Sequence, residues 1–154
     1  MLLSKSGQYA LQAMLQIASA PDGQPMRTNQ IAEALDVPAN TLSKVLSRLA
    51  RAGVLRSLRG PQGGFALAFP ADELTLAEAL APIESERLER RCLLGRARCS
   101  DANPCAAHDR WSALVDHIDD FLGDTTLANV VVAASPSSRG RRKAATRKPS
   151  RRSR

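Results

Sequence analysis

Apolar residues recur every three or four positions through the first third of the chain, the spacing of amphipathic helices. This pattern predicts three helices, and the breaks Pro21-Asp22-Gly23 and Asp36-Val37-Pro38 separate them. The predicted helices cover residues 6–20, 28–35 and 39–52. Gly53 then stands where a glycine commonly follows the end of a helix.

Two short apolar segments, residues 54–59 and 65–69, follow and predict strands. The link between them, Gly60-Pro61-Gln62-Gly63-Gly64, contains three glycines, which permit the positive φ values that a tight hairpin connection needs. Three helices followed by a hairpin predict a winged helix-turn-helix.

The second half of the chain is predicted to be helical, with one irregular segment. Thr75 and Glu78 fit a capping box that begins a short helix. Asn103 and Pro104 fit the start of a long helix that reaches Leu122, and a last short helix covers residues 127–133. The apolar stripe of the long helix is Trp111, Leu114, Val115, Ile118, Phe121 and Leu122. The fold class is therefore mainly α with a small β-hairpin, a winged helix-turn-helix followed by a long C-terminal dimerisation helix.

The formal net charge of +7 is distributed unevenly and suggests three segments. Residues 135–154 carry nine basic residues and no acidic one, whereas residues 70–134 have a net charge of −6 and residues 1–69 a net charge of +4. We expect a DNA-binding domain over residues 1–70 and a ligand-binding and dimerisation region over residues 71–133. Residues 134–154 are expected to be a disordered basic tail.

Size and composition exclude several classes of protein. The chain has 154 residues, 44% of them hydrophobic, which suffices for one modest core. No apolar run approaches the roughly 18 residues of a membrane span, and the N-terminus lacks a secretory signal, so a cytoplasmic location is expected. We find no phosphate-binding loop and no nucleophile motif, so we expect neither an enzyme nor a small-molecule substrate.

The third predicted helix has an apolar face and a basic face, and no acidic residue lies between positions 37 and 62. An ordinary amphipathic bundle, the alternative, usually has solvated faces of mixed sign. The residues that we expect to contact duplex DNA are Asn40, Thr41, Ser43, Lys44, Arg48, Arg51, Arg56 and Arg59. The first four are placed to reach base edges in the major groove, the next three to hold phosphates, and Arg59 to enter the minor groove beside the wing.

Cys92, Cys99 and Cys105 are the only cysteines, and His108 follows the last of them by three residues. Thiolates and imidazole together favour zinc or an iron–sulfur cluster over hard cations, and the spacing alone does not choose between these two. Buried, inert cysteines are the alternative, but this segment is too polar to be a core. Since Cys105 and His108 are three residues apart, we expect them on one face of the long helix, in its first turns.

With these residues in view, the chain resembles the Rrf2 family of bacterial transcription regulators, in its IscR-like and NsrR-like iron–sulfur branch. The resemblance covers residues 1–133. It is carried by the three cysteines, Leu3-Ser4-Lys5-Ser6-Gly7-Gln8-Tyr9-Ala10, Leu58-Arg59-Gly60-Pro61-Gln62-Gly63-Gly64-Phe65 and Thr125-Thr126-Leu127. It implies a homodimer and an iron–sulfur cluster on Cys92, Cys99 and Cys105, with zinc less favoured.

The resemblance also bears on the fourth ligand. Some members of the family have a histidine at the position of His108, whereas others take an acidic ligand from the first helix, where this chain has Gln8. His108 is therefore the expected fourth ligand, and 2Fe-2S is favoured over 4Fe-4S. The chain departs from IscR-like members at two places, in the six residues between its first two cysteines and in Ser43, which replaces a glutamate.

The function that follows is a DNA-binding transcriptional repressor. It would sense redox state, nitric oxide or iron–sulfur status through the cluster. The alternatives are a zinc- or thiol-based redox regulator without a cluster, or a small metal or redox enzyme.

Overall fold

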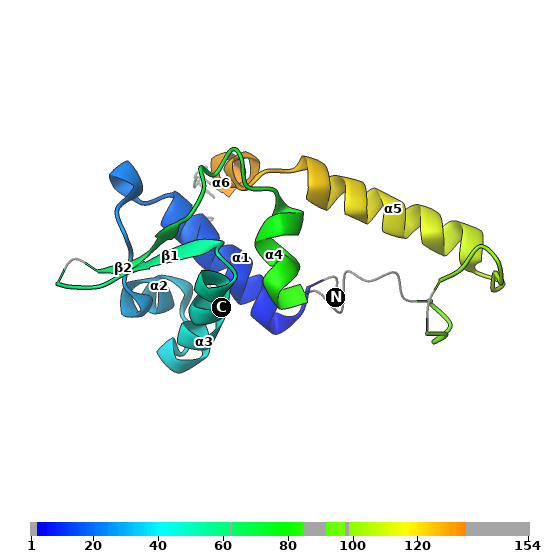
Figure 1. Ribbon diagram of the computed structural model, residues 1–154, viewed down its shortest axis with the longest axis horizontal. Coiled ribbons are helices and arrows are strands. Elements are labelled where there is room, and N and C mark those ends of the chain that lie inside the picture. Colours follow the sequence, from blue (N-terminus) through cyan, green and yellow to red (C-terminus); the bar gives the residue numbers. More distant parts are fainter. Residues whose placement is uncertain (1–2, 62, 85–91, 98, 135–154) are drawn as a thin grey trace, which may run out of the picture.

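The computed structural model describes residues 3–61, 63–84, 92–97 and 99–134, and it is helical apart from one hairpin (Figure 1). Its elements in chain order are α1 (Lys5–Ala18), the 3-10 helix η1 (Pro21–Gly23), α2 (Thr28–Leu35), α3 (Ala39–Arg51), β1 (Leu55–Leu58), β2 (Gly64–Leu67), α4 (Leu76–Glu84), α5 (His108–Asp124) and α6 (Leu127–Ala134). The predicted fold class, mainly α with a small β-hairpin and a winged helix-turn-helix, is confirmed, whereas dimerisation through the C-terminal helix stays a prediction. The predicted basic tail lies, from residue 135 onward, outside the described residues.

Helix α3 lies across α1 and α2 with its apolar face inward, as its sequence pattern predicted. The four residues of this face are all buried, namely Leu42, Val45, Leu46 and Leu49. Strands β1 and β2 then form an antiparallel hairpin in which Leu55 pairs with Leu67 and Leu58 with Gly64. Helix α3 also packs against β1, so the helix and the hairpin are neighbours, as in a winged helix-turn-helix.

The glycines of the wing have different structural roles. Gly60 has a φ of 106°, a left-handed value that other residues rarely adopt. A side chain at Gly64 would collide with Met26, because its Cβ would lie 2.6 Å from the Met26 carbonyl carbon. This closeness reflects a bridge between Met26 and Phe65, whose backbones exchange two hydrogen bonds of 2.9 Å. The base of the wing is thus fixed to the segment that precedes α2.

The second half of the chain returns to cover α1. Helices α4 and α6 both pack on α1, and they contribute Leu80 and Leu127, which are fully buried. The first residue of each helix bonds to the segment that precedes the other helix: Leu76 N–H donates to the Thr125 carbonyl (2.9 Å), and Leu127 N–H donates to the Leu74 carbonyl (2.8 Å). Residues beyond 70 therefore complete the core of the winged unit.

Thr75 and Glu78 form the predicted capping box at the start of α4. The Glu78 carboxylate accepts hydrogen bonds from the Thr75 N–H (3.0 Å) and hydroxyl (2.9 Å), and the Glu78 N–H donates to that hydroxyl (3.2 Å). The backbone bond and then the hydroxyl bond lower the pKa of Glu78, because both stabilise the carboxylate.

Glu84, the last residue of α4, is a buried carboxylate against the N-terminus of α1. Its side chain is 2% exposed, and its Oε1 accepts hydrogen bonds from the Ser4 N–H (2.9 Å) and the Ser4 hydroxyl. Ser4 is the N-cap of α1, and its hydroxyl in turn accepts from the Gly7 N–H (3.0 Å). Within the described residues, Oε2 of Glu84 has no hydrogen-bond partner. The end of α4 is thereby fixed to the start of α1.

Helix α5 begins at His108, not at the predicted start beside Asn103 and Pro104. The reason lies in Arg96, whose guanidinium donates to the Asn103 carbonyl (3.0 Å) and to its side-chain oxygen (3.3 Å). Since that side chain bonds to Arg96, it does not cap a helix. The chain makes turns from residue 100 to 107 instead, and α5 follows them.

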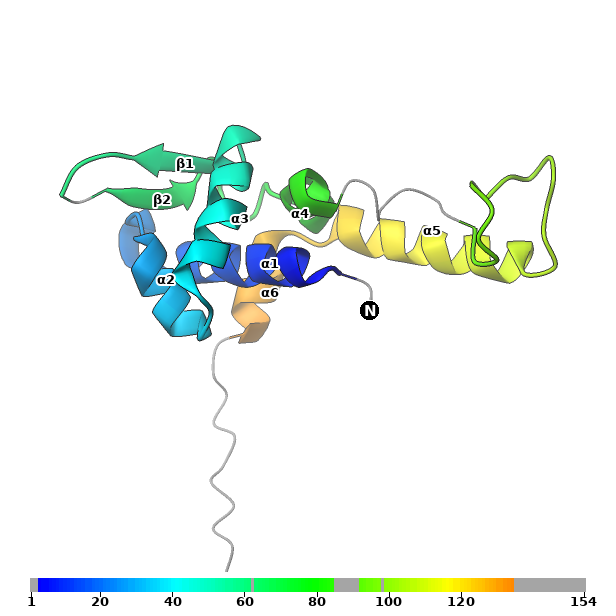
Figure 2. The ribbon, with the colours of Figure 1, turned by 90° about the horizontal axis from the view of Figure 1, so that it is seen from below.

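Helix α5 extends away from the core and carries the cysteine segment at its far end (Figures 1 and 2). Its C-terminal end is anchored by Leu122, which is buried, and by Ile118, which packs against the core. Leu114 and Phe121 remain 52% and 56% exposed. No helix within the described part of the chain is long and apolar enough to cross a membrane.

Candidate nucleic-acid interface and cysteine site

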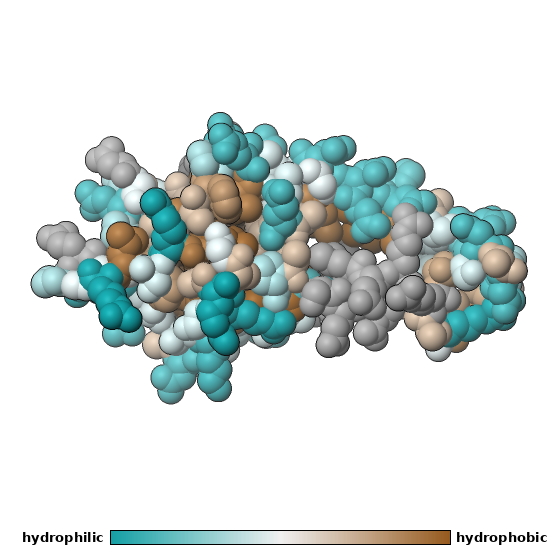
Figure 3. Space-filling view, viewed as in Figure 1, coloured by the Kyte–Doolittle hydropathy of each residue, from teal (hydrophilic) through white to brown (hydrophobic). Residues whose placement is uncertain are grey.

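All eight residues predicted to contact DNA have exposed side chains on α3 or the wing. Asn40, Thr41, Ser43 and Lys44 lie in the first two turns of α3, Arg48 and Arg51 in its last turn, Arg56 on β1, and Arg59 directly after β1. Hydrophilic side chains cover this outer side of α3 in the space-filling view (Figure 3). This surface combines the first turns of α3 with two arginines of the hairpin, Arg56 and Arg59.

Two of these arginines are oriented by the backbone beside them. Nε of Arg56 donates to the Leu67 carbonyl (3.3 Å) and so lies along the hairpin. Nε of Arg51 donates to the Ser47 carbonyl (3.5 Å), one turn earlier in α3. Each of these bonds uses only the Nε–H of the guanidinium. The two terminal amino groups of each arginine are suited to bind a phosphate.

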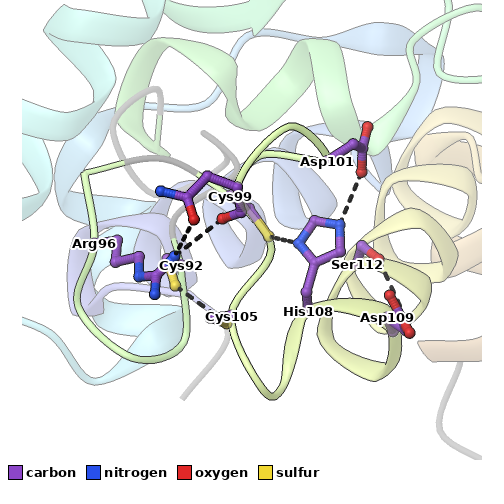
Figure 4. Close-up of polar contacts among 9 residues, drawn as sticks. Cys92, Arg96, Cys99, Asp101, Cys105, His108, Asp109 and Ser112 are labelled. Carbon is purple, nitrogen blue, oxygen red and sulfur yellow. Dashed lines mark hydrogen bonds and ion pairs between the residues drawn. The ribbon is translucent and has the colours of Figure 1, made fainter.

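The four predicted metal ligands occur in two pairs around the start of α5 (Figure 4). Sγ of Cys92 lies 3.7 Å from Sγ of Cys105, and Sγ of Cys99 lies 3.3 Å from Nδ1 of His108. The expected placement of Cys105 and His108 on one helix face is wrong, because Cys105 lies in the turn that precedes α5. His108 is buried, at the first position of the helix.

Asp101 is a site residue that the sequence did not identify. Its Oδ1 lies 2.8 Å from Nε2 of His108, so the carboxylate accepts a hydrogen bond from that nitrogen (Figure 4). A proton on Nε2 leaves the Nδ1 lone pair directed at Cys99, and this tautomer is the one that can ligate a metal through Nδ1. In the sequence, the only sign of this role is that Asp101 lies two positions after Cys99.

Cys92 is in surroundings that favour a thiolate. Its side chain is 7% exposed. The backbone N–H of Leu94 has the largest effect and lowers the pKa of the Cys92 thiol, as do the Arg96 N–H, the Cys105 thiol and the Arg96 charge, while burial raises it. Arg96 falls within the described residues, whereas Arg91 and Arg98, which directly precede Cys92 and Cys99 in the sequence, lie outside them.

The two pairs do not merge into one site. Among the described residues, no three Cys, His, Asp or Glu side chains are grouped so that they could hold a single metal ion. The Cys99–His108 pair borders a hollow of about 40 Å³, lined also by Asp101, Ser112 and Val115. The sulfur and imidazole ligands therefore form two separate pairs, Cys92 with Cys105 and Cys99 with His108.

Comparison with known proteins finds transcriptional regulators, both among family models and among individual relatives. Residues 3–133 match a family described as "Rrf2: Iron-dependent Transcriptional regulator". The chain is 33% identical over 131 residues to the HTH-type transcriptional regulator IscR of Pectobacterium carotovorum, a match that covers 85% of this chain and 79% of that protein. It is 34% identical over 131 residues to a protein of Neisseria meningitidis named as an HTH-type transcriptional regulator, covering 85% of this chain and 88% of that protein.

Solved structures show the same fold. CymR (YrzC), the global cysteine regulator of B. subtilis, superposes with a TM-score of 0.72 at 23% identity, over 85% of this chain and 96% of that chain. IscR of T. potens superposes with a TM-score of 0.70 at 23% identity, over 86% and 87%. At this level of identity the likeness concerns the fold alone.

Proposed function

Because this chain belongs to the Rrf2 family of transcriptional regulators, we propose that it is a repressor whose DNA affinity depends on an iron–sulfur cluster. The relatives reported above are named as HTH-type transcriptional regulators and not as enzymes. The observation that carries the proposal is the arrangement of the cysteine site as two close pairs of soft ligands. We assign DNA binding to residues 1–70, ligand binding and dimerisation to residues 71–133, and a basic tail to residues 134–154.

The DNA-binding part of the proposal assigns base contacts to the start of α3 and backbone contacts to its end. Asn40, Thr41, Ser43 and Lys44 would face base edges, and Arg48, Arg51 and Arg56 would bind phosphates. Arg59 stands at the tip side of β1, where a wing reaches the minor groove. The exposure of all eight side chains supports this assignment.

We expect Arg59→Ala to weaken specific binding by about 1–3 kcal/mol, because it removes a charged contact to the groove. The measurement is a titration against a duplex that the wild-type chain enriches from a random library, at physiological salt. Arg48→Ala is the matched control: as a phosphate contact, it should lower affinity for all duplexes alike and reduce the salt slope by about 0.9. An Arg59→Ala variant with wild-type affinity would contradict the wing assignment.

The distances within the pairs suit two metal atoms. Two thiolates at about 2.3 Å from one tetrahedral metal lie about 3.8 Å apart, and a thiolate and an imidazole nitrogen about 3.6 Å apart. The observed separations, 3.7 Å for Cys92–Cys105 and 3.3 Å for Cys99–His108, are close to these values. A cluster with two irons has room for one pair on each iron, so the two pairs support 2Fe-2S over a single zinc ion.

When bound, such a cluster would supply a centre that gains or loses an electron and reacts with oxidants or nitric oxide. Cys92, Cys99, Cys105 and His108 would hold it. Asp101 would keep the proton on Nε2 of His108, so that Nδ1 is available as a ligand. Arg96 would hold the loop through Asn103 and stabilise the Cys92 thiolate.

Anaerobic purification followed by iron and acid-labile sulfide analysis tests the cluster. We expect about two irons and two sulfides per chain, and loss of both in Cys105→Ala. Cluster-loaded and cluster-free protein should differ in DNA affinity by about 5–150-fold, the usual range of coupling between two sites. Stoichiometric zinc without sulfide would rule out the cluster, and equal affinity of both forms would rule out the switch.

A thiol-based regulator is the second candidate, since Cys92 and Cys105 lie within 3.7 Å and Cys92 has a lowered pKa. An oxidant would take two electrons and two protons from these thiols and form a disulfide between them. Mass spectrometry of oxidised, metal-free protein checks this. A loss of about 2 Da that maps to Cys92 and Cys105, with altered DNA affinity in the absence of iron, would favour it.

We also propose a homodimer joined through α5. Leu114 and Phe121 are seven residues apart and therefore lie on the same side of the helix, and both are more than half exposed. A two-fold contact between copies of α5 would bury them. In the competing arrangement, the apolar stripe of α5 packs on the winged unit of its own chain. Of that stripe, only Leu122 and Ile118 pack against the core in this way.

A further inference from the structure

Arg27 connects two parts of the DNA-binding unit that are 34 residues apart in sequence. It lies at the N-cap of α2, where its backbone N–H donates to Oε1 of Gln30 (2.9 Å). Its guanidinium reaches in the other direction and donates from Nη2 to the carbonyl oxygen of Pro61, in the wing. The side chain therefore spans from the helix-turn-helix to the hairpin loop.

The wing is held at its base by other contacts. The two backbone bonds between Met26 and Phe65 fix the start of β2. Closer to the tip, the Gly63 N–H donates to the Gly60 carbonyl (2.9 Å), a bond that closes the loop upon itself without tying it to another element. Among the described residues, the Arg27 guanidinium is the side chain that ties this loop to α2.

We propose that Arg27 is a positioning residue for the wing, which holds Pro61 and, two residues earlier, Arg59 in the orientation that DNA requires. The inference rests on the proposed contact of Arg59 with DNA. Glycine-rich loops have a large conformational freedom, which must be lost when they bind. A wing held in place before DNA arrives loses less of this freedom on binding, so Arg27 raises affinity without touching DNA.

A basic side chain at the start of α2 has an obvious competing role as a direct phosphate contact. The two roles lead to different results. If Arg27 contacts a phosphate, replacing it should lower DNA affinity by the same factor whether or not Arg59 is present, and should lower the salt slope by about 0.9. If Arg27 positions the wing, it acts through Arg59. Replacing it should then lower affinity little once Arg59 is absent, and the salt slope should change little.

A double-mutant cycle on the full chain separates these roles. The variants are Arg27→Ala, Arg59→Ala and the double variant, titrated against the duplex that the wild-type chain enriches from a random library. We expect Arg27→Ala to lower affinity about 3–10-fold, and less than about twofold when Arg59 is already alanine. Arg48→Ala, combined with Arg59→Ala in the same way, is the control and should give additive losses with a lower salt slope.

Amide hydrogen exchange without DNA gives a second, independent measurement. In Arg27→Ala the Gly63 amide should exchange about 3–10-fold faster, whereas amides of the α1–α3 core should be unchanged. Unchanged exchange at Gly63, or additive losses of Arg27 and Arg59, would overturn the proposal. If Arg59→Ala binds DNA like wild type, the proposed wing contact fails and the DNA-binding role of Arg27 with it, while the exchange result still reports whether Arg27 holds the wing.

Discussion

Gly7→Ala is expected to destabilise the fold by about 2–4 kcal/mol, although helix propensity alone gives the opposite sign. In the interior of a helix, alanine is normally more stable than glycine by about 0.5–1 kcal/mol. At Gly7, however, the added Cβ would lie 2.8 Å from the carboxyl carbon of Glu84 and closer still to Oε1. The buried carboxylate would have to move off Ser4, so that Oε1 would lose the hydrogen bonds that it accepts from Ser4.

Denaturant unfolding at a fixed protein concentration measures this effect. Gly123→Ala is the matched control, because Gly123 lies in α5 and its Cβ would meet nothing within 4 Å. That control should be neutral or slightly stabilising. The double variant Gly7→Ala/Glu84→Ala should lose less stability than the sum of its single variants, since the collision is then absent. A Gly7→Ala protein as stable as wild type would contradict the contact with Glu84.

Glutamate at Leu114 or Phe121 is expected to raise the dissociation constant of the proposed dimer by about 100-fold or more. Both side chains are more than half exposed in the single chain, so a charge there costs little unless a partner covers it. Within an apolar interface, an unpaired carboxylate costs several kcal/mol. Light scattering at micromolar concentration should show a dimer for wild type and a monomer for either variant.

Gly123→Glu is the control for the dimer experiment, because Gly123 is exposed on the side of α5 opposite Leu114 and Phe121, and a Cβ there would meet nothing within 4 Å. It should leave the dimer intact. A wild-type chain that is monomeric at micromolar concentration would contradict the α5 interface. In that case Leu114 and Phe121 would be surface residues of a monomer.

The parts of the fold that depend on local sequence were predictable. The two faces of α3 follow from residue spacing, and the capping box at Thr75 and Glu78 was visible as a short motif. The glycines of the wing also indicated a hairpin. However, the need for glycine at position 64 comes from Met26, which is distant in sequence.

The parts that depend on distant partners were not predictable. Asn103 has the sequence of a helix cap, yet its side chain bonds to Arg96, so α5 starts later. The burial of Glu84 could not be read from a charged residue at the end of a helix, because the partner Ser4 is 80 positions away. The cysteine cluster was visible in the sequence, whereas the pairing of Cys92 with Cys105 depends on how the loop folds.

The position of Leu127 has a consequence for the synthesis of this protein. The side chain is fully buried in the core that α1 shares with α6. A ribosome makes α1 first and α6 more than 100 residues later, so the apolar face of α1 remains partly uncovered until nearly the whole described chain has been made. We therefore expect a product that terminates before residue 127 to leave this part of the core exposed and to be a target of cellular proteases.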